Sequence, residues 1–200
     1  MTTSSKVPEI IGIAGTNGSG KDTLGHMLAD RHKYLFVSVT DLLRAECVRR
    51  GLPPIRENTR MVSAEWRREL GLGVLIDKAI AEYELVRDEY EGVAISSLRN
   101  PGEVDRVHDF GGIVVWIDAD ARVRYDRIQR NVEQRDRKDD KRTFKQFVAE
   151  EEAEMHKPVG GDAASLDGTA VKAKCDLFID NTHENVAVFD ADAEKQLGLA

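Results

Sequence analysis

One short segment near the N-terminus constrains the fold of this chain more than any other feature. The segment Gly15-Thr16-Asn17-Gly18-Ser19-Gly20-Lys21-Asp22-Thr23 follows the apolar run 9–14 and opens the amphipathic stretch 21–33. Glycines permit the backbone angles that turn successive N–H groups towards one phosphate. A helix that starts at the lysine adds its positive N-terminal end. The G-x-x-x-x-G-K spacing between a buried strand and a helix therefore predicts a phosphate-binding loop.

The loop, a Walker A motif, is expected to hold ATP, with the Lys21 ammonium reaching the β- and γ-phosphates. In the usual pattern a Ser or Thr follows the lysine and contacts Mg²⁺, but here Asp22 does, with Thr23 next. A carboxylate there could bind Mg²⁺, which prefers oxygen ligands, or could simply complement the helix dipole. The candidate nucleotide-binding residues of the loop are Gly15, Asn17, Gly18, Ser19, Gly20, Lys21, Asp22 and Thr23.

Short β-branched runs alternate with longer amphipathic stretches along the chain, which predicts parallel βαβ units and a three-layer α/β domain. The expected strands are 9–14, 35–38, 92–96, 112–118 and 177–180. The expected helices are 21–33, 41–50 with Asp41 near its N-cap, 58–70, 73–88, 101–108, 121–131, one from Thr143, and 185–197. Residues 156–174 are rich in Gly, Ala and Asp and are expected to form an irregular connection.

The amino-acid composition limits the kinds of partner that this protein is expected to bind. A net charge of −7 over 200 residues argues against general nucleic-acid binding, which draws on excess Lys and Arg. The apolar runs are too short to cross a bilayer, and the first residues lack the apolar core of a secretory signal. The isolated Cys47 and Cys175 suit a reducing compartment. We therefore expect a cytoplasmic protein with no nucleic-acid or membrane partner.

Two arginines stand where a second anion could be held. Arg44 lies one turn into the helix after the second expected strand, and Arg99 follows the third. Open α/β sheets bind ligands at the carboxyl ends of their strands, and a planar guanidinium can grip a phosphate with two hydrogen bonds. A surface position for both arginines is the alternative.

These motifs together resemble the nucleoside monophosphate kinase superfamily of P-loop proteins. The resemblance rests on GTNGSGKDT, SVTDLLR, ISSLRNPGEVD and a late Arg-rich segment, and it covers about residues 9–190. SVTDLLRAE is similar to the segment by which adenylate kinases hold the acceptor phosphate. GKDT with LRNPGEVDRVHDFGGIVVWID resembles phage-type deoxynucleoside monophosphate kinases. RENTRMVSAEWRRELGLGVLIDKAI resembles an archaeal group loosely labelled dephospho-CoA kinase-like.

The resemblance implies a P-loop NTPase fold with a five-stranded parallel sheet in the order 2-3-1-4-5. A single domain over residues 1–200 would combine a core (8–40, 91–130 and 143–200), a helical acceptor-binding region (41–90) and a short lid (131–142). The implied cofactors are ATP and Mg²⁺. The implied partner is a small phosphorylated acceptor, bound by a monomer or a homodimer.

The resemblance also implies roles for single residues. Arg44 and Arg99 would hold the acceptor phosphate, with Asp41 beside them. Asn181 and Thr182 would touch the adenine ring, unless they cap a helix. The candidate catalytic residues are Lys21, Arg44, Arg99 and the lid arginines Arg130, Arg135 and Arg137, with Arg127 as an alternative ordered member. A solvated charged face is the other interpretation of residues 133–142.

One departure concerns the metal. Members of the superfamily generally carry an acidic residue at the end of the third strand, whereas this sequence has Ser96 and Ser97. Our hypothesis is that Asp22 supplies the negative oxygen from the loop side and that Ser96 or Ser97 supplies a neutral contact. The alternatives are that Asp41 reaches the water shell of the metal, or that the site binds nucleotide without efficient catalysis.

Within the acceptor region, a base or ribose could be contacted by Trp66, Arg67, Arg68 and Glu69, but we favour a helix with Trp66 in the core and its arginines in solvent. The expected function is transfer of the γ-phosphate of ATP to a nucleoside monophosphate. A dephospho-CoA kinase or other metabolite kinase is the first alternative, with Asp41 orienting a hydroxyl acceptor. A nucleotide-binding ATPase without an acceptor is the second.

Overall fold

Five parallel strands form the centre of the computed structural model, which describes residues 7–130, 142–183 and 185–199. The strands are β1 Ile10–Gly15, β2 Tyr34–Ser38, β3 Gly92–Leu98, β4 Ile113–Asp118 and β5 Leu177–Asp180. Their order across the sheet is β2-β3-β1-β4-β5, and each neighbouring pair is parallel. The expected α/β class and strand order are confirmed.

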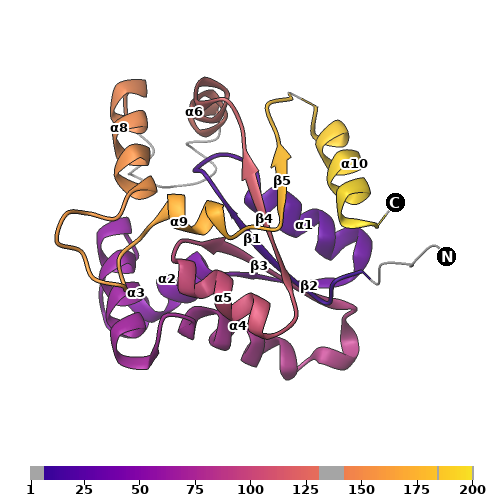
Figure 1. The fold of residues 1–200 in the computed structure, drawn as a ribbon, viewed down its shortest axis with the longest axis horizontal. Coiled ribbons are helices and arrows are strands. Elements are labelled where there is room, and N and C mark those ends of the chain that lie inside the picture. Colours follow the sequence, from indigo (N-terminus) through magenta and orange to yellow (C-terminus); the bar gives the residue numbers. More distant parts are fainter. Residues whose placement is uncertain (1–6, 131–141, 184, 200) are drawn as a thin grey trace.

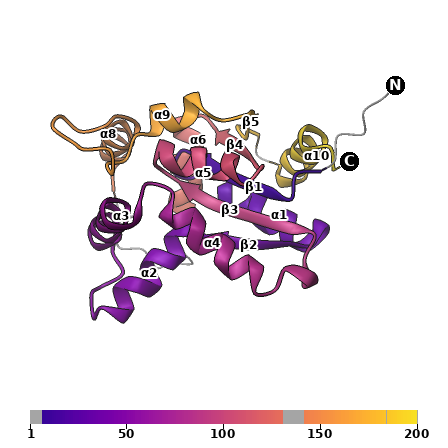
Figure 2. The same ribbon diagram turned by 60° about the horizontal axis from the view of Figure 1, so that its bottom comes forward.

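Helices cover both faces of the sheet, as Figures 1 and 2 show. One face packs against α1 Lys21–His32 and α10 Val186–Leu197 through apolar side chains such as Leu28 and Phe189. The other face packs against α2 Val39–Arg49, α3 Arg56–Leu70, α4 Val74–Glu84, α5 Pro101–Asp109 and α9 Gly168–Ala173. Every residue of β3 is buried, as expected for a central strand of a parallel sheet covered on both faces.

Two further helices stand beyond the carboxyl ends of the strands. Helices α6 Ala121–Arg130 and α8 Phe144–Met155 pack together through Tyr125, Phe144 and Phe147, whose rings meet edge-on or tilted. In both views α8 also lies next to α3. The expected lid falls almost entirely on residues 131–141, which lie outside the described residues.

Several boundaries differ from the sequence expectation. Helix α2 begins at Val39, because the Ser38 hydroxyl caps it by accepting the Asp41 N–H at 3.3 Å. Asp41 therefore lies in the first turn and is not the cap. Helix α4 ends at Glu84 and is followed by a short 3₁₀ helix, Arg87–Glu89. The connection expected to be irregular contains α9, capped by Asp167. No helix in the described ranges has the length and apolar character needed to span a membrane.

Candidate nucleotide and acceptor site

A cavity of about 1040 Å³ opens at the carboxyl ends of β1, β2, β3 and β5. Its lining combines the loop after β1, the start of α2, one face of α3, the β3–α5 connection, α6, α8 and the β5–α10 connection. Segments far apart in sequence therefore share one space. The candidates that line it are Asn17, Gly18, Gly20, Lys21, Asp22, Thr23, Arg44, Ser97, Arg99, Arg127, Arg130 and Asn181.

The loop after β1 has the backbone that its glycines were expected to allow. Gly18 has φ 79° and Gly20 has φ 103°, both left-handed values. A Cβ on Gly20 would lie 2.4 Å from Asn181 Nδ2, so no larger residue fits without a shift. No side chain from the described part of the chain caps the N-terminus of α1 at Gly20. The first N–H groups of α1 are therefore available to an anion in the cavity.

Lys21 is buried within this loop, with 7% of its surface exposed. Its Nζ donates to the Thr16 carbonyl oxygen at 2.5 Å. Burial, and secondarily the positive charge of Arg99, lower the pKa of Lys21 to about 7. The neighbouring Thr16 hydroxyl donates to Asp118 Oδ1 at 2.7 Å, which fixes the loop to the end of β4. An anionic ligand beside Lys21 would stabilise the charged form of the amine.

Asp22 and Ser96, the two candidate metal ligands, are adjacent. The Ser96 hydroxyl donates to Asp22 Oδ1 at 3.3 Å, so the carboxylate from α1 lies against the end of β3. Ser97 lines the cavity with φ 74°, a left-handed value that is rare outside glycine. Among the described residues no group of three or more His, Cys, Asp or Glu side chains could hold a metal ion. One carboxylate with hydroxyls fits Mg²⁺ only where phosphate oxygens and water complete its shell.

Arg44 lines the cavity and is paired with Asp41. Its Nη1 donates to Asp41 Oδ1 at 2.9 Å, and its side chain is 29% exposed. The Asp41 carboxylate, 68% exposed, is thus held by an arginine on its own helix.

Arg99 lies in the same cavity but points to a different partner. Its Nη1 donates to Glu154 Oε2 on α8 at 2.5 Å. Glu154 Oε1 also meets Arg60 at 2.5 Å and Arg56 at 3.1 Å, both from α3. Burial raises the pKa of Glu154, but Arg99, Arg56 and Arg60 outweigh it and lower the pKa to about 2.

A buried network fixes the connection that carries Arg99. Glu103 is fully buried, and its Oε2 accepts the N–H groups of Arg99 at 2.7 Å and Asn100 at 3.1 Å. Its Oε1 accepts from Arg67 Nη2 at 2.6 Å. Arg67 is only 3% exposed, so the expectation that it faces solvent is wrong: a carboxylate on α5 pairs with it. Arg68, in contrast, is solvent-exposed and pairs with Asp162.

At the other end of the cavity, Asn181 and Thr182 support the loops around them. Asn181 Nδ2 donates to the Ser19 carbonyl at 2.7 Å, which fixes the phosphate loop from the end of β5. The Thr182 hydroxyl donates to Asp180 at 2.5 Å and accepts the Asp120 N–H at 3.1 Å. The apolar lining here comes instead from Val123, Ile128, Val186 and Phe189.

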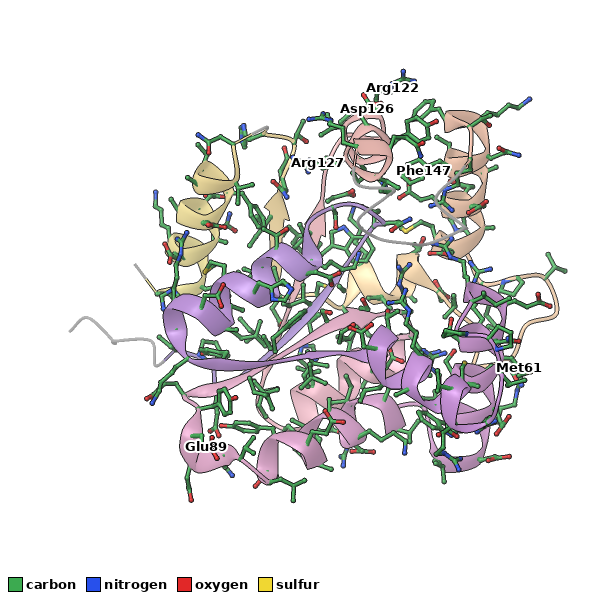
Figure 3. The ribbon with its side chains drawn as sticks, turned by 180° about the vertical axis from the view of Figure 1, so that it is seen from behind. Met61, Glu89, Arg122, Asp126, Arg127 and Phe147 are labelled. Carbon is green, nitrogen blue, oxygen red and sulfur yellow. The ribbon has the colours of Figure 1, made fainter. Side chains whose placement is uncertain are left out.

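Helix α6 contributes the described part of the Arg-rich segment. Arg127 and Arg130 line the cavity, and Arg127 Nη2 donates to the His183 carbonyl at 2.5 Å. Figure 3 shows Arg127 on the side of α6 that faces α10, with Phe147 between α6 and α8. Arg135 and Arg137 lie outside the described residues.

Sequence reasoning missed Arg124, on the same helix. It is 4% exposed, donates from Nε to Ala119 O at 2.7 Å, and contacts Asn17 O at 3.3 Å. It also forms a bidentate ion pair with Glu151 of α8. Arg124 thereby joins the phosphate loop to α8.

Comparisons with known proteins identify the family and the fold of this chain. Residues 11–155 match the family model described as an AAA domain. A UPF0200 protein of Pyrobaculum aerophilum is 33% identical over 150 residues, covering 73% of this chain and 77% of the relative. The shikimate kinase of Bacteroides thetaiotaomicron superposes with a TM-score of 0.55 at 16% identity, covering 95% of this chain and 98% of that one. A gluconokinase of Sinorhizobium meliloti superposes with a TM-score of 0.53 at 16% identity, covering 96% and 93%. The two structures share the P-loop kinase fold with this chain.

Proposed function

This chain belongs to the AAA-domain family and to the UPF0200 proteins, within the kinase-like P-loop NTPases, and on that premise we propose that it transfers the γ-phosphate of ATP to a nucleoside monophosphate. One observation carries the proposal. A single cavity is lined both by the phosphate-binding loop and by arginines from α2 and the β3–α5 connection. That is the arrangement needed to bring two phosphorylated ligands face to face.

Positioning and charge neutralisation would account for most of the catalysis. The loop backbone and the N-terminus of α1 would hold the triphosphate, and the Lys21 ammonium would neutralise charge on the transferring group. Mg²⁺ would be held beside Asp22 and Ser96, where it would neutralise negative charge on the phosphates. Arg127 and Arg130 border the same space from α6 and would add positive charge. The apolar end formed by Val123, Ile128, Val186 and Phe189 would receive the base.

The state of Asp41 does not match the role expected of this residue with a hydroxyl acceptor. A hydroxyl acceptor such as dephospho-CoA would need a carboxylate to orient it, and Asp41 was the one positioned candidate. In the structure that carboxylate is bound to Arg44 and is largely exposed. An ionised phosphate acceptor needs no base, and arginines that line the cavity, Arg44 and Arg99 among them, would bind it directly.

The proposal is tested by ADP release from Mg²⁺-ATP, measured with a panel of ribo- and deoxyribonucleoside monophosphates and dephospho-CoA. We expect at least one monophosphate to accelerate ADP release well above the rate without acceptor. If dephospho-CoA alone accelerates ADP release, the acceptor is dephospho-CoA and not a nucleoside monophosphate. ADP release that is equal with and without every acceptor would contradict the kinase assignment and support an ATPase.

A further inference from the structure

Glu154 is the carboxylate that a cluster of three arginines of the cavity shares: Arg56, Arg60 and Arg99. The three guanidinium groups come from two separate parts of the chain, α3 and the β3–α5 connection, and all three meet this side chain. Glu154 is 11% exposed, and every member of the set lines the cavity. The carboxylate therefore sits inside the space that would receive a ligand.

Within the described residues, the arginines of the cluster outnumber their carboxylate partners. Three arginines share the largely buried Glu154, and Arg56 alone has a second partner in this part of the chain, the half-exposed Glu150 at 3.2 Å, which also pairs with Arg142. Burial lowers the pKa of Arg56, and the positive charges of Arg142, Arg99 and Arg60 lower it further, against the opposite effect of Glu154. Three partly exposed guanidinium groups that share one carboxylate would bind an anion of greater charge more strongly.

The cluster is separate from Arg44, whose guanidinium pairs with Asp41 on α2. Arg99, expected to act together with Arg44, is directed instead to the α3 arginines through Glu154. The cavity thus contains two groups of cations on its acceptor side, and the larger group is closed by a residue of α8.

We propose that Arg56, Arg60 and Arg99 form a binding site for a dianionic phosphate group, which Glu154 occupies until the phosphate displaces it. This inference rests on the proposed function in one respect, that the phosphate belongs to the acceptor. Phosphate offers more negative charge and more acceptor oxygens than the carboxylate, and arginine forks suit it. Displacement would release the end of α8 from α3, so acceptor binding and movement of α8 would be coupled.

The site can be tested without turnover, with inorganic phosphate as the probe. Binding is measured by calorimetry with the phosphate loop filled by Mg²⁺ and a non-hydrolysable ATP analogue. The decisive variant is Glu154→Gln, which keeps the shape and removes the charge. Its matched control is Glu152→Gln on the same helix, where the carboxylate is 72% exposed and contacts His156.

We expect Glu154→Gln to tighten phosphate binding by about tenfold or more, because the internal competitor is gone, and Glu152→Gln to leave it unchanged. Adding Arg60→Gln to the first variant should reverse the gain. An unchanged phosphate affinity in Glu154→Gln, or a gain that survives Arg60→Gln, would overturn the proposal.

Arg60→Gln in the otherwise unchanged chain provides a second test if Glu154→Gln does not fold, because Arg60 is 45% exposed. It should weaken phosphate binding about fivefold or more, and no effect would again overturn the site. These readouts are independent of ADP release. If phosphate displaces Glu154 but no acceptor increases ADP release, the proposed function is wrong and the anion-binding site is still supported.

Discussion

At the scale of single residues, the buried amine of Lys21 links nucleotide binding to pH. The pKa of Lys21 in the free protein is about 7, and a bound triphosphate favours its charged form. Above this pKa the free protein has lost the proton, so binding must take one up. The dissociation constant of Mg²⁺-ATP should therefore rise between about pH 7.5 and 9, by up to about tenfold per unit. Calorimetric titrations across that range measure it.

Lys21→Arg is the control for this prediction, because a guanidinium stays charged throughout. The affinity of this variant for Mg²⁺-ATP should not change with pH over the same range, whatever its absolute value. A wild-type affinity that is equally flat would contradict the role of the Lys21 charge.

The contact between Asp22 and Ser96 leads to a prediction about Mg²⁺ binding. If the Asp22 carboxylate replaces the acidic residue missing from the end of β3, Asp22→Ser should raise the Mg²⁺ concentration for half-maximal turnover by about tenfold or more. Asp30→Ser, at the exposed far end of the same helix, is the control. An unchanged Mg²⁺ requirement in Asp22→Ser would show that Asp22 only complements the helix dipole.

Arg44 tests the assignment of the acceptor side. Arg44→Ala should raise the KM of the acceptor about tenfold or more and leave the KM of ATP nearly unchanged, since loss of a charged hydrogen bond costs about 1.5–3 kcal/mol. Arg49→Ala, on the same helix with a side chain that is 73% exposed, is the control. Steady-state kinetics with both substrates varied give the result, and an equal effect on both KM values would contradict it.

At the scale of elements, Glu103 on α5 joins α3 to the β3–α5 connection. Glu103→Gln would leave the buried Arg67 cation without its anion, so we expect the free energy of unfolding to fall by about 3–5 kcal/mol. Urea denaturation measures it. Asp105→Asn removes the exposed ion pair with Lys174 from the same helix and should cost about 1 kcal/mol or less. An equal loss of unfolding free energy in both variants would mean that the buried Glu103–Arg67 pair stabilises the protein no more than an exposed ion pair does.

Local patterns explain which elements the sequence could predict. The phosphate loop, the strands and most helices follow from glycine spacing, apolar runs and caps, all of which act over a few residues. The start of α2 was placed two residues late because Ser38 and Asp41 are both good N-terminal residues, and only the backbone distinguishes them.

Contacts between distant elements explain what the sequence could not predict. Arg56 and Arg60 are four residues apart on α3, as are Glu150 and Glu154 on α8, so each pair reads as an ordinary charged helix face. Nothing in that spacing says that the two faces meet. The burial of Arg67 was missed for the same reason, because its partner Glu103 lies 36 positions away.

At the scale of the whole molecule, strand order creates the site. The β2-β3-β1 arrangement places the end of β3, with Ser96 and Arg99, between the phosphate loop and α2. Helix α8 then borders the cavity with two carboxylates about one turn apart. Glu151 binds Arg124, which contacts the phosphate loop, and Glu154 binds the acceptor-side arginines. One helix therefore contacts both halves of the proposed active site.

The central claim is that one cavity presents two anions to each other. A crystal structure of the chain with Mg²⁺, a non-hydrolysable ATP analogue and inorganic phosphate tests it most directly. We predict the terminal phosphate of the nucleotide beside Lys21 and a separate phosphate in the same cavity, bound by Arg99 with Arg44 or the α3 arginines. A nucleotide outside the glycine loop, or a second anion bound away from these arginines, would contradict the account.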